Sequence, residues 1–169
     1  MRPPRLLRPA DQQTAHRVAA RPRGRQRALF AVTAIPAGAV VLFLDGELYD
    51  APSRFSVQVG VARHVDAPRD LADAAAADRY LWRNLNHSCC PNTVLHERAL
   101  VAARPIAAGE EVCFDYEANE WQMASPFACG CGAPRCRWRV RGYRFLSAAG
   151  RRAVARFASA HVLALAAES

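Results

Sequence analysis

The sequence predicts a mostly β fold of short strands with little helix, and three observations support this. Apolar residues either alternate with polar ones or form short blocks bounded by Gly and Pro, as in strands of about four to eight residues. Apolar residues make up 51% of the 169-residue chain, which is enough for a buried core. No run of about 18 uncharged apolar residues occurs, so no membrane-spanning helix and no membrane partner are expected.

Four segments are expected along the chain. Residues 1–22 mix Pro, Arg and Gln without periodicity and are predicted to be a basic mobile arm. Residues 23–126 contain the strand signals, and residues 127–146 contain a cysteine cluster. Residues 147–169 are predicted to form one amphipathic helix capped by Ser147. Its apolar stripe consists of Val154, Phe157, Ala158, Val162 and Leu165.

The strand signals follow one another through the central segment. Apolar blocks at 28–32 and 39–44, separated by an Ile-Pro-Ala-Gly turn, predict a β-hairpin. Residues 54–65 alternate, with Phe55, Val57, Val59 and Val61 on one face, and predict a half-buried strand. The alanine-rich stretch 70–85 predicts a short helix. Residues 93–117 predict three more strands, and their Ile-Ala-Ala-Gly turn repeats the earlier one.

The charge is distributed unevenly along the chain. All 23 basic residues are arginine, and the formal net charge is +8. Residues 1–27 and 135–169 each carry +7, whereas residues 28–134 carry −6. The acidic body would attract a cationic substrate. The arginine-rich ends suit contact with a nucleic acid or an acidic partner.

Three of the six cysteines lie close together, at Cys129, Cys131 and Cys136. The N-terminus lacks the apolar segment of a secretory signal, so a reducing, cytoplasmic location is expected. In such a compartment clustered cysteines more often bind metal than form disulfides. Structural zinc needs four ligands. Spacing favours Cys89 as the fourth but leaves other candidates open, namely Cys90, Cys113, His87 and His96.

Three motifs carry a family resemblance. They are "RNLNHSCCPN" at 83–92, "GEEVCFDYE" at 109–117 and "CGCGAPRCRW" at 129–138. Together they resemble a compact, bacterial-type SET-domain protein-lysine methyltransferase with a post-SET zinc segment, over about residues 23–140. The resemblance implies small antiparallel sheets around a knot-like crossing, in which residues 112–117 thread beside 83–88.

The resemblance also implies the site residues. The cysteine of N-H-S-C completes one structural zinc site, so the ligands would be Cys89, Cys129, Cys131 and Cys136. Tyr116 matches the catalytic tyrosine, and Phe114 lines the lysine channel. The cofactor would be S-adenosylmethionine, with Trp138 stacked on its adenine and His87 bound mainly through its backbone. The implied cofactor-binding residues are Arg27, Ala28, Leu29, Arg83, Asn86, His87, Tyr116 and Trp138.

The residue types fit methyl transfer to a lysine of a protein substrate, and the acidic body predicts that this substrate is basic. Phe114 in place of Tyr leaves that wall without a hydroxyl group, which predicts di- or trimethylation. Gln26 and Ala28 stand where the family usually has glycines, and Asn84 replaces an aromatic residue. The alternative function is a catalytically degenerate SET-like zinc module that binds nucleic acid or an acidic partner through its arginine-rich ends.

Overall fold

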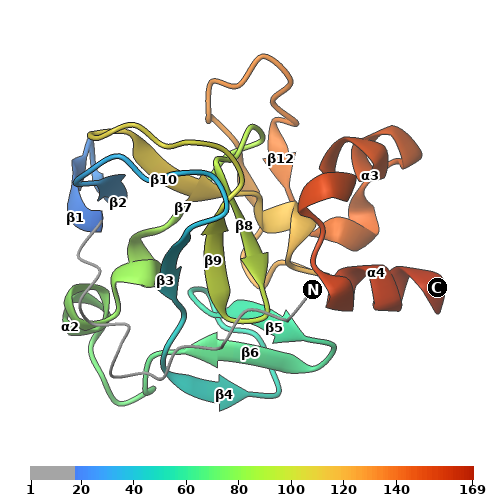
Figure 1. The fold of residues 1–169 in the computed structure, drawn as a ribbon. Coiled ribbons are helices and arrows are strands. Elements are labelled where there is room, and N and C mark those ends of the chain that lie inside the picture. Colours follow the sequence, from blue (N-terminus) through green and yellow to red (C-terminus); the bar gives the residue numbers. More distant parts are fainter. Residues whose placement is uncertain (1–17) are drawn as a thin grey trace, which may run out of the picture.

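Small β-sheets and a few short helices make up residues 18–169, the part of the chain that the computed structural model describes (Figure 1). The mostly β fold is therefore confirmed. The strands are β1 (Val18–Arg23), β2 (Gln26–Ala31), β3 (Val40–Phe43), β4 (Glu47–Tyr49), β5 (Val57–Gly60), β6 (Arg63–Asp66), β7 (Asn86–His87), β8 (Thr93–His96), β9 (Ala99–Ala102), β10 (Glu111–Phe114), β11 (Phe127–Ala128) and β12 (Arg139–Val140). The helices are α2 (Asp73–Arg79), α3 (Ala148–Val154) and α4 (Ala160–Ala167). The 3-10 turns are η1 (Leu81–Asn84), η2 (Tyr116–Ala118), η3 (Tyr143–Phe145) and η4 (Ala155–Phe157).

A four-stranded sheet in the order β1-β2-β10-β7 positions the candidate site. Strand β1 pairs with β2 in antiparallel register, from Val18 opposite Ala31 to Arg23 opposite Gln26. The predicted arm was therefore wrong for residues 18–22, which belong to this strand, and its remainder lies outside the described residues. Backbone pairing with β2 orders a segment that has no apolar periodicity of its own.

The predicted hairpin of blocks 28–32 and 39–44 was wrong. Strand β2 pairs with β1 and β10, whereas β3 pairs with β9 in a different sheet. The two similar turns instead contact each other, because Ile35 and Ile106 form an antiparallel bridge with reciprocal N–H···O bonds of 2.9 Å. Both isoleucines are buried, so apolar burial brings together two turns that are distant in sequence.

The single strand predicted over 54–65 was also wrong, since β5 and β6 form a hairpin within it. The chain reverses at Val61, which is 56% exposed, contrary to the predicted apolar face. Gln58 is buried although the alternation placed it toward solvent. Its side chain accepts a hydrogen bond from the Trp121 N–H at 2.7 Å, which replaces the water that it would otherwise contact.

The three strands predicted over 93–117 are confirmed as β8, β9 and β10. Asn92, at the end of the N-H-S-C-C-P-N motif, ties this region together. Its side chain donates to Glu110 Oε1 at 3.0 Å and to the Glu111 carbonyl at 2.8 Å, and accepts from the Cys113 N–H at 3.0 Å. The first two motifs of the sequence are therefore directly hydrogen-bonded to each other.

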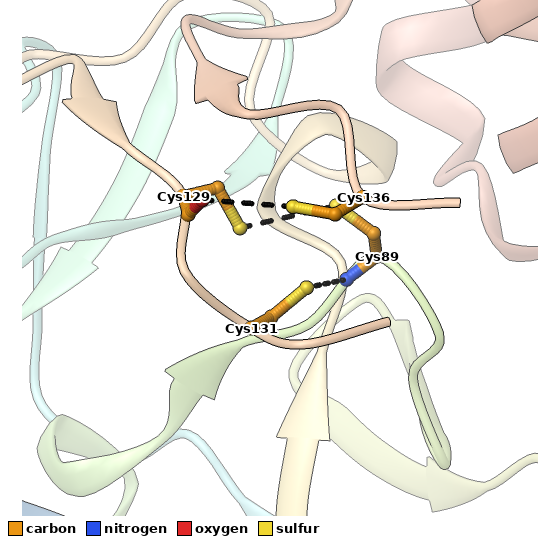
Figure 2. A group of neighbouring side chains, drawn as sticks. All are labelled: Cys89, Cys129, Cys131 and Cys136. Carbon is orange, nitrogen blue, oxygen red and sulfur yellow. Dashed lines mark hydrogen bonds between the residues drawn. The ribbon is translucent and has the colours of Figure 1, made fainter. Parts of the chain in front are cut away.

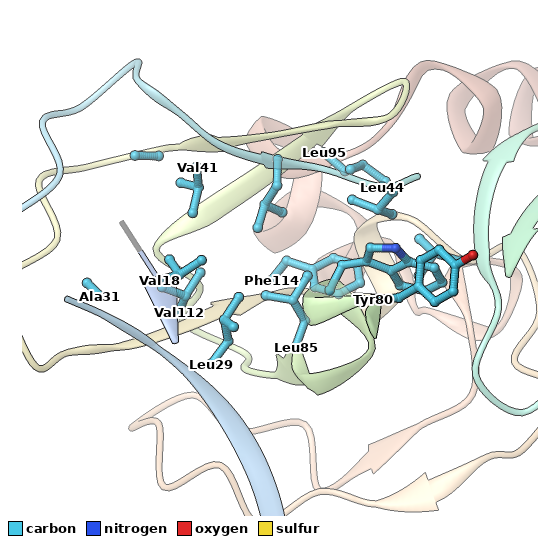
Figure 3. Packing of buried hydrophobic residues seen from close by; sticks show 14 of the residues in the cluster. Val18, Leu29, Ala31, Val41, Leu44, Tyr80, Leu85, Leu95, Val112 and Phe114 are labelled. Carbon is cyan, nitrogen blue, oxygen red and sulfur yellow. The ribbon is translucent and has the colours of Figure 1, made fainter. Parts of the chain in front are cut away.

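The larger of two apolar clusters among residues 18–169 lies between the sheets, and Figure 3 shows part of it. Leu29 of β2 and Val112 of β10 are opposite one another in the register and are fully buried. Phe114, Leu85 and Val41 extend the same cluster toward the other sheets. Burying a side chain of this size stabilises the fold by about 1.5–3 kcal/mol relative to leaving it exposed.

The helices are shorter than expected. The helix predicted within 70–85 is α2 followed by η1, and Ser147 caps α3 as predicted, accepting from the Gly150 N–H at 3.1 Å. The single helix predicted over 147–169 was wrong, because the chain is extended at Ala158 and restarts as α4. There the Ser159 N–H donates to the Ala118 carbonyl at 2.9 Å, and this tertiary bond replaces helical ones. Within residues 18–169, the helices are too short or too polar to cross a membrane.

Candidate functional site

Two distant segments meet side by side at the candidate site. Strand β7 pairs with β10 in parallel, with Asn86 opposite Cys113 and His87 opposite Phe114. Just beyond β10, the Tyr116 hydroxyl donates to the Leu85 carbonyl at 2.6 Å. The crossing that the resemblance implied is therefore present, and it fixes the tyrosine against the Asn-His pair.

His87 joins this crossing to the cysteine cluster. Its Nδ1 accepts the Tyr116 N–H at 3.1 Å, and its Nε2 lies 3.3 Å from Cys89 Sγ. Burial, reinforced by the charge of Arg137, lowers the pKa of His87 to about 3, so the ring is neutral. Because Nδ1 accepts a hydrogen bond, the ring proton is on Nε2, which donates a hydrogen bond to the Cys89 sulfur. The side chain is thus fully engaged inside the fold, and only the backbone remains for a cofactor.

Four cysteines converge on one point, as Figure 2 shows. The sulfur atoms of Cys89, Cys129, Cys131 and Cys136 all lie within 4.8 Å of one another. The corners of a tetrahedral zinc–thiolate site lie about 3.8 Å apart, from a zinc–sulfur distance of about 2.3 Å. Among the open candidates for the fourth ligand, the geometry therefore selects Cys89.

His87 lies beside the cluster, with its Nε2 against Cys89 Sγ, but the other three candidates for the fourth ligand are placed elsewhere. Cys90 is exposed, and its N–H donates to Ser88 Oγ at 3.1 Å. Cys113 lies on β10 with its sulfur 3.7 Å from Asn92 Oδ1. His96 is an exposed residue of β8. The residues around the four sulfurs fit a metal ion, since three backbone N–H groups point at sulfur: Cys89 to Cys131 at 3.5 Å, Arg137 to Cys89 at 3.4 Å, and Trp138 to Cys136 at 3.4 Å.

Arg137 links the cysteine segment to the end of β10. Its guanidinium contacts Glu117 Oε2 at 2.6 Å and Asp115 Oδ1 at 2.5 Å. Both carboxylates are only 2% exposed. Burial raises the pKa of Asp115 to about 6, although Arg137 acts to lower it. Asp115 and Glu117 flank Tyr116 in the sequence. The two ion pairs therefore hold the segment of residues 127–140 close to Tyr116.

The predicted cofactor residues of β2 lie beside Asn86. The Asn86 side chain donates to the Arg27 carbonyl at 3.3 Å and to Glu111 Oε1 at 3.0 Å. Ala28 and Leu29 are fully buried in β2, so neither exposes its side chain to a cofactor. The structure thus brings Arg27, Ala28, Leu29, Asn86, His87 and Tyr116 together on one sheet or at its end.

Trp138 combines two unusual features. The residue is 75% exposed, and its backbone has a φ of 62°, a left-handed conformation that is uncommon for a bulky residue. The strain follows from the cysteine cluster, since the Trp138 N–H bonds to Cys136 sulfur and its carbonyl accepts the Cys129 N–H at 2.8 Å. An exposed ring held in a strained conformation beside the crossing suits the predicted stacking on an adenine.

Arg83 lies in η1, outside the sheet that carries Arg27, Ala28, Leu29, Asn86 and His87. Its guanidinium pairs with Asp66 at 3.0 Å and Asp73 at 3.1 Å and lies over the Phe55 ring. Its neighbour Asn84, which replaces an aromatic residue, donates to the Ala77 carbonyl at 2.7 Å and so terminates α2. Gln26 is exposed at the start of β2.

A small cavity lies on the Phe114 side of Tyr116. It has a volume of about 70 Å³, and Trp82, Leu85, Phe114 and Tyr116 line it together with Glu120. The Phe114 and Tyr116 rings lie 4.8 Å apart. Phe114 therefore lines this cavity beside Tyr116. No sequence pattern predicts Glu120 as a site residue; its one signal is that it is an acidic residue close after the tyrosine.

Comparison with known proteins agrees with this geometry. Residues 26–117 match the model of the SET domain family. The methyltransferase flvH of Aspergillus flavus is 29% identical over 123 residues, which are 69% of this chain and 62% of that protein. Human histone-lysine N-methyltransferase 2B is 31% identical over 126 residues, 66% of this chain and 5% of the human protein.

Solved structures agree as well. KRYPTONITE in complex with mCHG DNA and SAH has a TM-score of 0.54 and 25% identity, over 76% of this chain and 30% of that one. The chain belongs to the SET-domain family, since the family model covers more than half of it. It spans less than two thirds of the length of each of these relatives.

Proposed function

We propose that the protein is a methyltransferase that uses S-adenosylmethionine to methylate the side-chain amine of lysine in a protein substrate. One observation carries this proposal: the parallel pairing of β7 with β10 sets the Tyr116 phenol against the Asn86–His87 backbone. The relatives named as histone-lysine methyltransferases and the SAH in a solved neighbour support the same chemistry.

The residues around the crossing would hold the cofactor and the amine on opposite sides of Tyr116. The backbone of Arg27, Asn86 and His87 and the ring of Trp138 would bind the cofactor. The bound cofactor supplies a methyl group on a positively charged sulfur. Burial raises the pKa of Tyr116, so its phenol stays protonated and orients groups rather than acting as a base. Positioning of this kind accounts for much of the rate of an in-line displacement.

One structural zinc ion on the four cysteines is part of the proposal. Three sulfurs lie in residues 127–140 and the fourth on Cys89, so the ion would pin this segment beside the crossing. Binding free energies of about 10 kcal/mol or more are typical of structural zinc in small modules. Ligation by thiolates needs a reducing compartment, which agrees with the expected cytoplasmic location.

The proposed degree of lysine methylation depends on Phe114. It is buried against Tyr116 and places no hydroxyl group on the cavity wall. A methylated amine would then keep the freedom to rotate and react again, so we expect di- or trimethyllysine. The substrate is proposed to be a basic protein, because the central part of the chain is acidic.

The deciding experiment combines a calorimetric titration with S-adenosylmethionine and an activity assay of Tyr116→Phe. We expect cofactor binding, and a loss of methyl transfer of about 100-fold, as misplacement of a reacting group produces, with zinc content unchanged. Tyr143→Phe is the matched control, since Tyr143 is also buried but lies in a separate apolar cluster. Absence of cofactor binding would reject the enzyme and favour the degenerate zinc module.

A further inference from the structure

A buried carboxylate lines the small cavity, and the inference drawn from it rests on the proposed function. Glu120 follows η2 and lies on the cavity wall with Phe114 and Tyr116. The cavity volume of about 70 Å³ is roughly five times what one water molecule needs. The end of a lysine side chain, four carbons and a nitrogen, matches this size.

The two oxygens of Glu120 differ in their surroundings. Oε1 accepts hydrogen bonds from the Gln58 N–H at 2.7 Å and from Asn119 Nδ2 at 3.1 Å. For Oε2, no hydrogen bond or ion pair is found among residues 18–169. One oxygen is thus anchored, while the other has no partner among these residues and is available to a ligand. A charged group of this kind is a strong acceptor for an ammonium donor.

The charged and titratable groups around Glu120 do not neutralise it. Arg83 lies on the same wall but is paired with two aspartates, and Arg54 lies at the exposed mouth. Tyr116 stays protonated, and its hydroxyl group donates a hydrogen bond to the Leu85 carbonyl. His161 donates to the Asn119 carbonyl at 2.7 Å rather than to the carboxylate.

Burial raises the pKa of Glu120 to about 7. A carboxylate titrating near neutrality is a better proton acceptor than an ordinary one, and this is the range in which general bases work best. Lysine ammonium groups have an ordinary pKa of about 10.4, so the substrate must lose a proton before its nitrogen can react.

We propose that Glu120 binds the ammonium group of the substrate lysine in this cavity and accepts one of its protons. An N–H bond of the ammonium breaks and an Oε2–H bond forms. The products are a neutral amine, whose lone pair is free for methyl transfer, and a neutral carboxyl group. The carboxyl proton returns to solvent through the open mouth of the cavity.

The test uses Glu120→Gln, whose amide oxygen still accepts from Gln58 and Asn119. A peptide of histone H3(1–15) and its counterpart with norleucine in place of every lysine serve as probes, with n-butylammonium as a sequence-independent probe. We expect the wild type to prefer the lysine peptide by about 10- to 100-fold, as for a charge-assisted hydrogen bond. The variant should lose this preference, whereas Glu97→Gln, at an exposed carboxylate, should keep it.

The second readout is the pH dependence of methyl transfer. The wild-type rate should fall as the pH drops below about 7, the pKa of Glu120. The variant should be slower by at least about 100-fold near neutrality and should recover as the pH approaches the pKa of free lysine.

The outcomes separate the two proposals. An active variant with the wild-type pH profile and lysine preference would overturn the role of Glu120 and leave the proposed function standing. A wild type that transfers no methyl group would reject the proposed function, and the peptide comparison would still decide whether Glu120 binds an ammonium. Failure of the wild type to bind any of the probes would also overturn the inference.

An independent observation is an arginine-lined groove between the cysteine segment and α3, with a volume of about 930 Å³. Its arginines are Arg135, Arg137, Arg139, Arg141 and Arg156. The one acidic residue on its wall, Glu117, is held by Arg137. Among residues 18–169, the other four arginines pair with no carboxylate. None of the proposed cofactor residues lines this groove.

Aromatic rings accompany these arginines. Phe145 is 42% exposed on the groove wall, and the guanidiniums of Arg141 and Arg144 lie 5.2 Å and 5.3 Å from its ring centre. Guanidinium groups match phosphate oxygens in a bidentate manner. The exposed Phe145 ring offers a stacking surface for a base. An acidic peptide would use the charges but not the ring.

We infer that this groove binds the phosphodiester backbone of a single-stranded nucleic acid. Fluorescence anisotropy with an oligonucleotide of about 16 nucleotides tests it, at the upper end of site sizes for such grooves. Four phosphate contacts predict a slope of about −2.8 in log affinity against log salt, so a fourfold rise in salt should weaken binding about 50-fold.

Two double variants, each with two arginines replaced by glutamine, test the role of the groove. Arg135→Gln with Arg139→Gln should reduce the magnitude of that slope by about 1.4, whereas Arg25→Gln with Arg63→Gln, at exposed sites outside the groove, should leave it unchanged. An equal effect of the two pairs, or equally tight binding of polyglutamate, would overturn the inference in favour of non-specific charge or an acidic protein partner.

Discussion

Replacing Arg137 with methionine removes the guanidinium that pairs with two buried carboxylates, Asp115 and Glu117. Methionine keeps most of the apolar length of the side chain, so the change is chiefly one of charge. The N–H of residue 137, which donates to Cys89 sulfur, is unaffected because it belongs to the backbone.

The expected loss is large because both carboxylates are almost inaccessible to water. Breaking a buried ion pair by removing one partner costs about 3–5 kcal/mol. Arg139→Met is the matched control, since Arg139 lies two residues away, is exposed and makes no ion pair among the described residues. An exposed substitution of that kind changes stability by about 0.5 kcal/mol at most.

The pH dependence follows from Asp115. Its pKa in the folded protein is about 6, above its ordinary value of 3.8. Between these two pH values the folded state binds a proton that the unfolded state lacks, so the folded state loses stability as the pH rises from about 4 to about 6. Removing the Arg137 charge raises the pKa of Asp115 further and moves the window upward. The destabilisation should therefore shrink on acidification from about pH 8 to about pH 6, by about 1.4 kcal/mol for each pH unit over which only the folded variant holds the proton.

Urea unfolding of the zinc-loaded protein at the two pH values measures these differences. The control variant corrects for any effect of pH on the cysteine cluster, which both variants share. A destabilisation below about 1 kcal/mol at the higher pH, the range of exposed ion pairs, would refute the reasoning. So would a destabilisation that is the same at both pH values.

Three further outcomes are expected. Cys89→Ser should lower the zinc content measured by native mass spectrometry, while Cys90→Ser should not, because only Cys89 joins the sulfur cluster; equal zinc contents would argue against it. Phe114→Tyr should shift peptide products, followed by intact mass, toward monomethyllysine, because the added hydroxyl restricts the product amine; an unchanged product distribution would contradict this. Gly142→Ala should lower the free energy of unfolding by about 1–3 kcal/mol, because φ is 116° and the new methyl group would meet the Trp121 carbonyl at 2.6 Å; a melting curve like that of the wild type would count against it.

Local patterns in the sequence determined much of this protein. The strands at 93–96, 99–102 and 111–114, the cap at Ser147 and the cysteine cluster all follow from alternation, capping chemistry and spacing, which depend on neighbouring residues alone. The family resemblance added the crossing of residues 83–88 with 112–117, because its motifs carry long-range information that periodicity lacks.

Tertiary structure decided the partners of these elements. The blocks at 28–32 and 39–44 entered different sheets because strand pairing depends on which distant edge is free. The C-terminal helix broke at Ser159 because a tertiary hydrogen bond replaced helical ones. Glu120 became a buried cavity residue in the irregular segment after η2, which has no repeat from which to predict the direction of a side chain. Strand propensity, helix capping and cysteine spacing can be predicted from neighbouring residues, whereas burial and strand pairing depend on residues that only folding brings together.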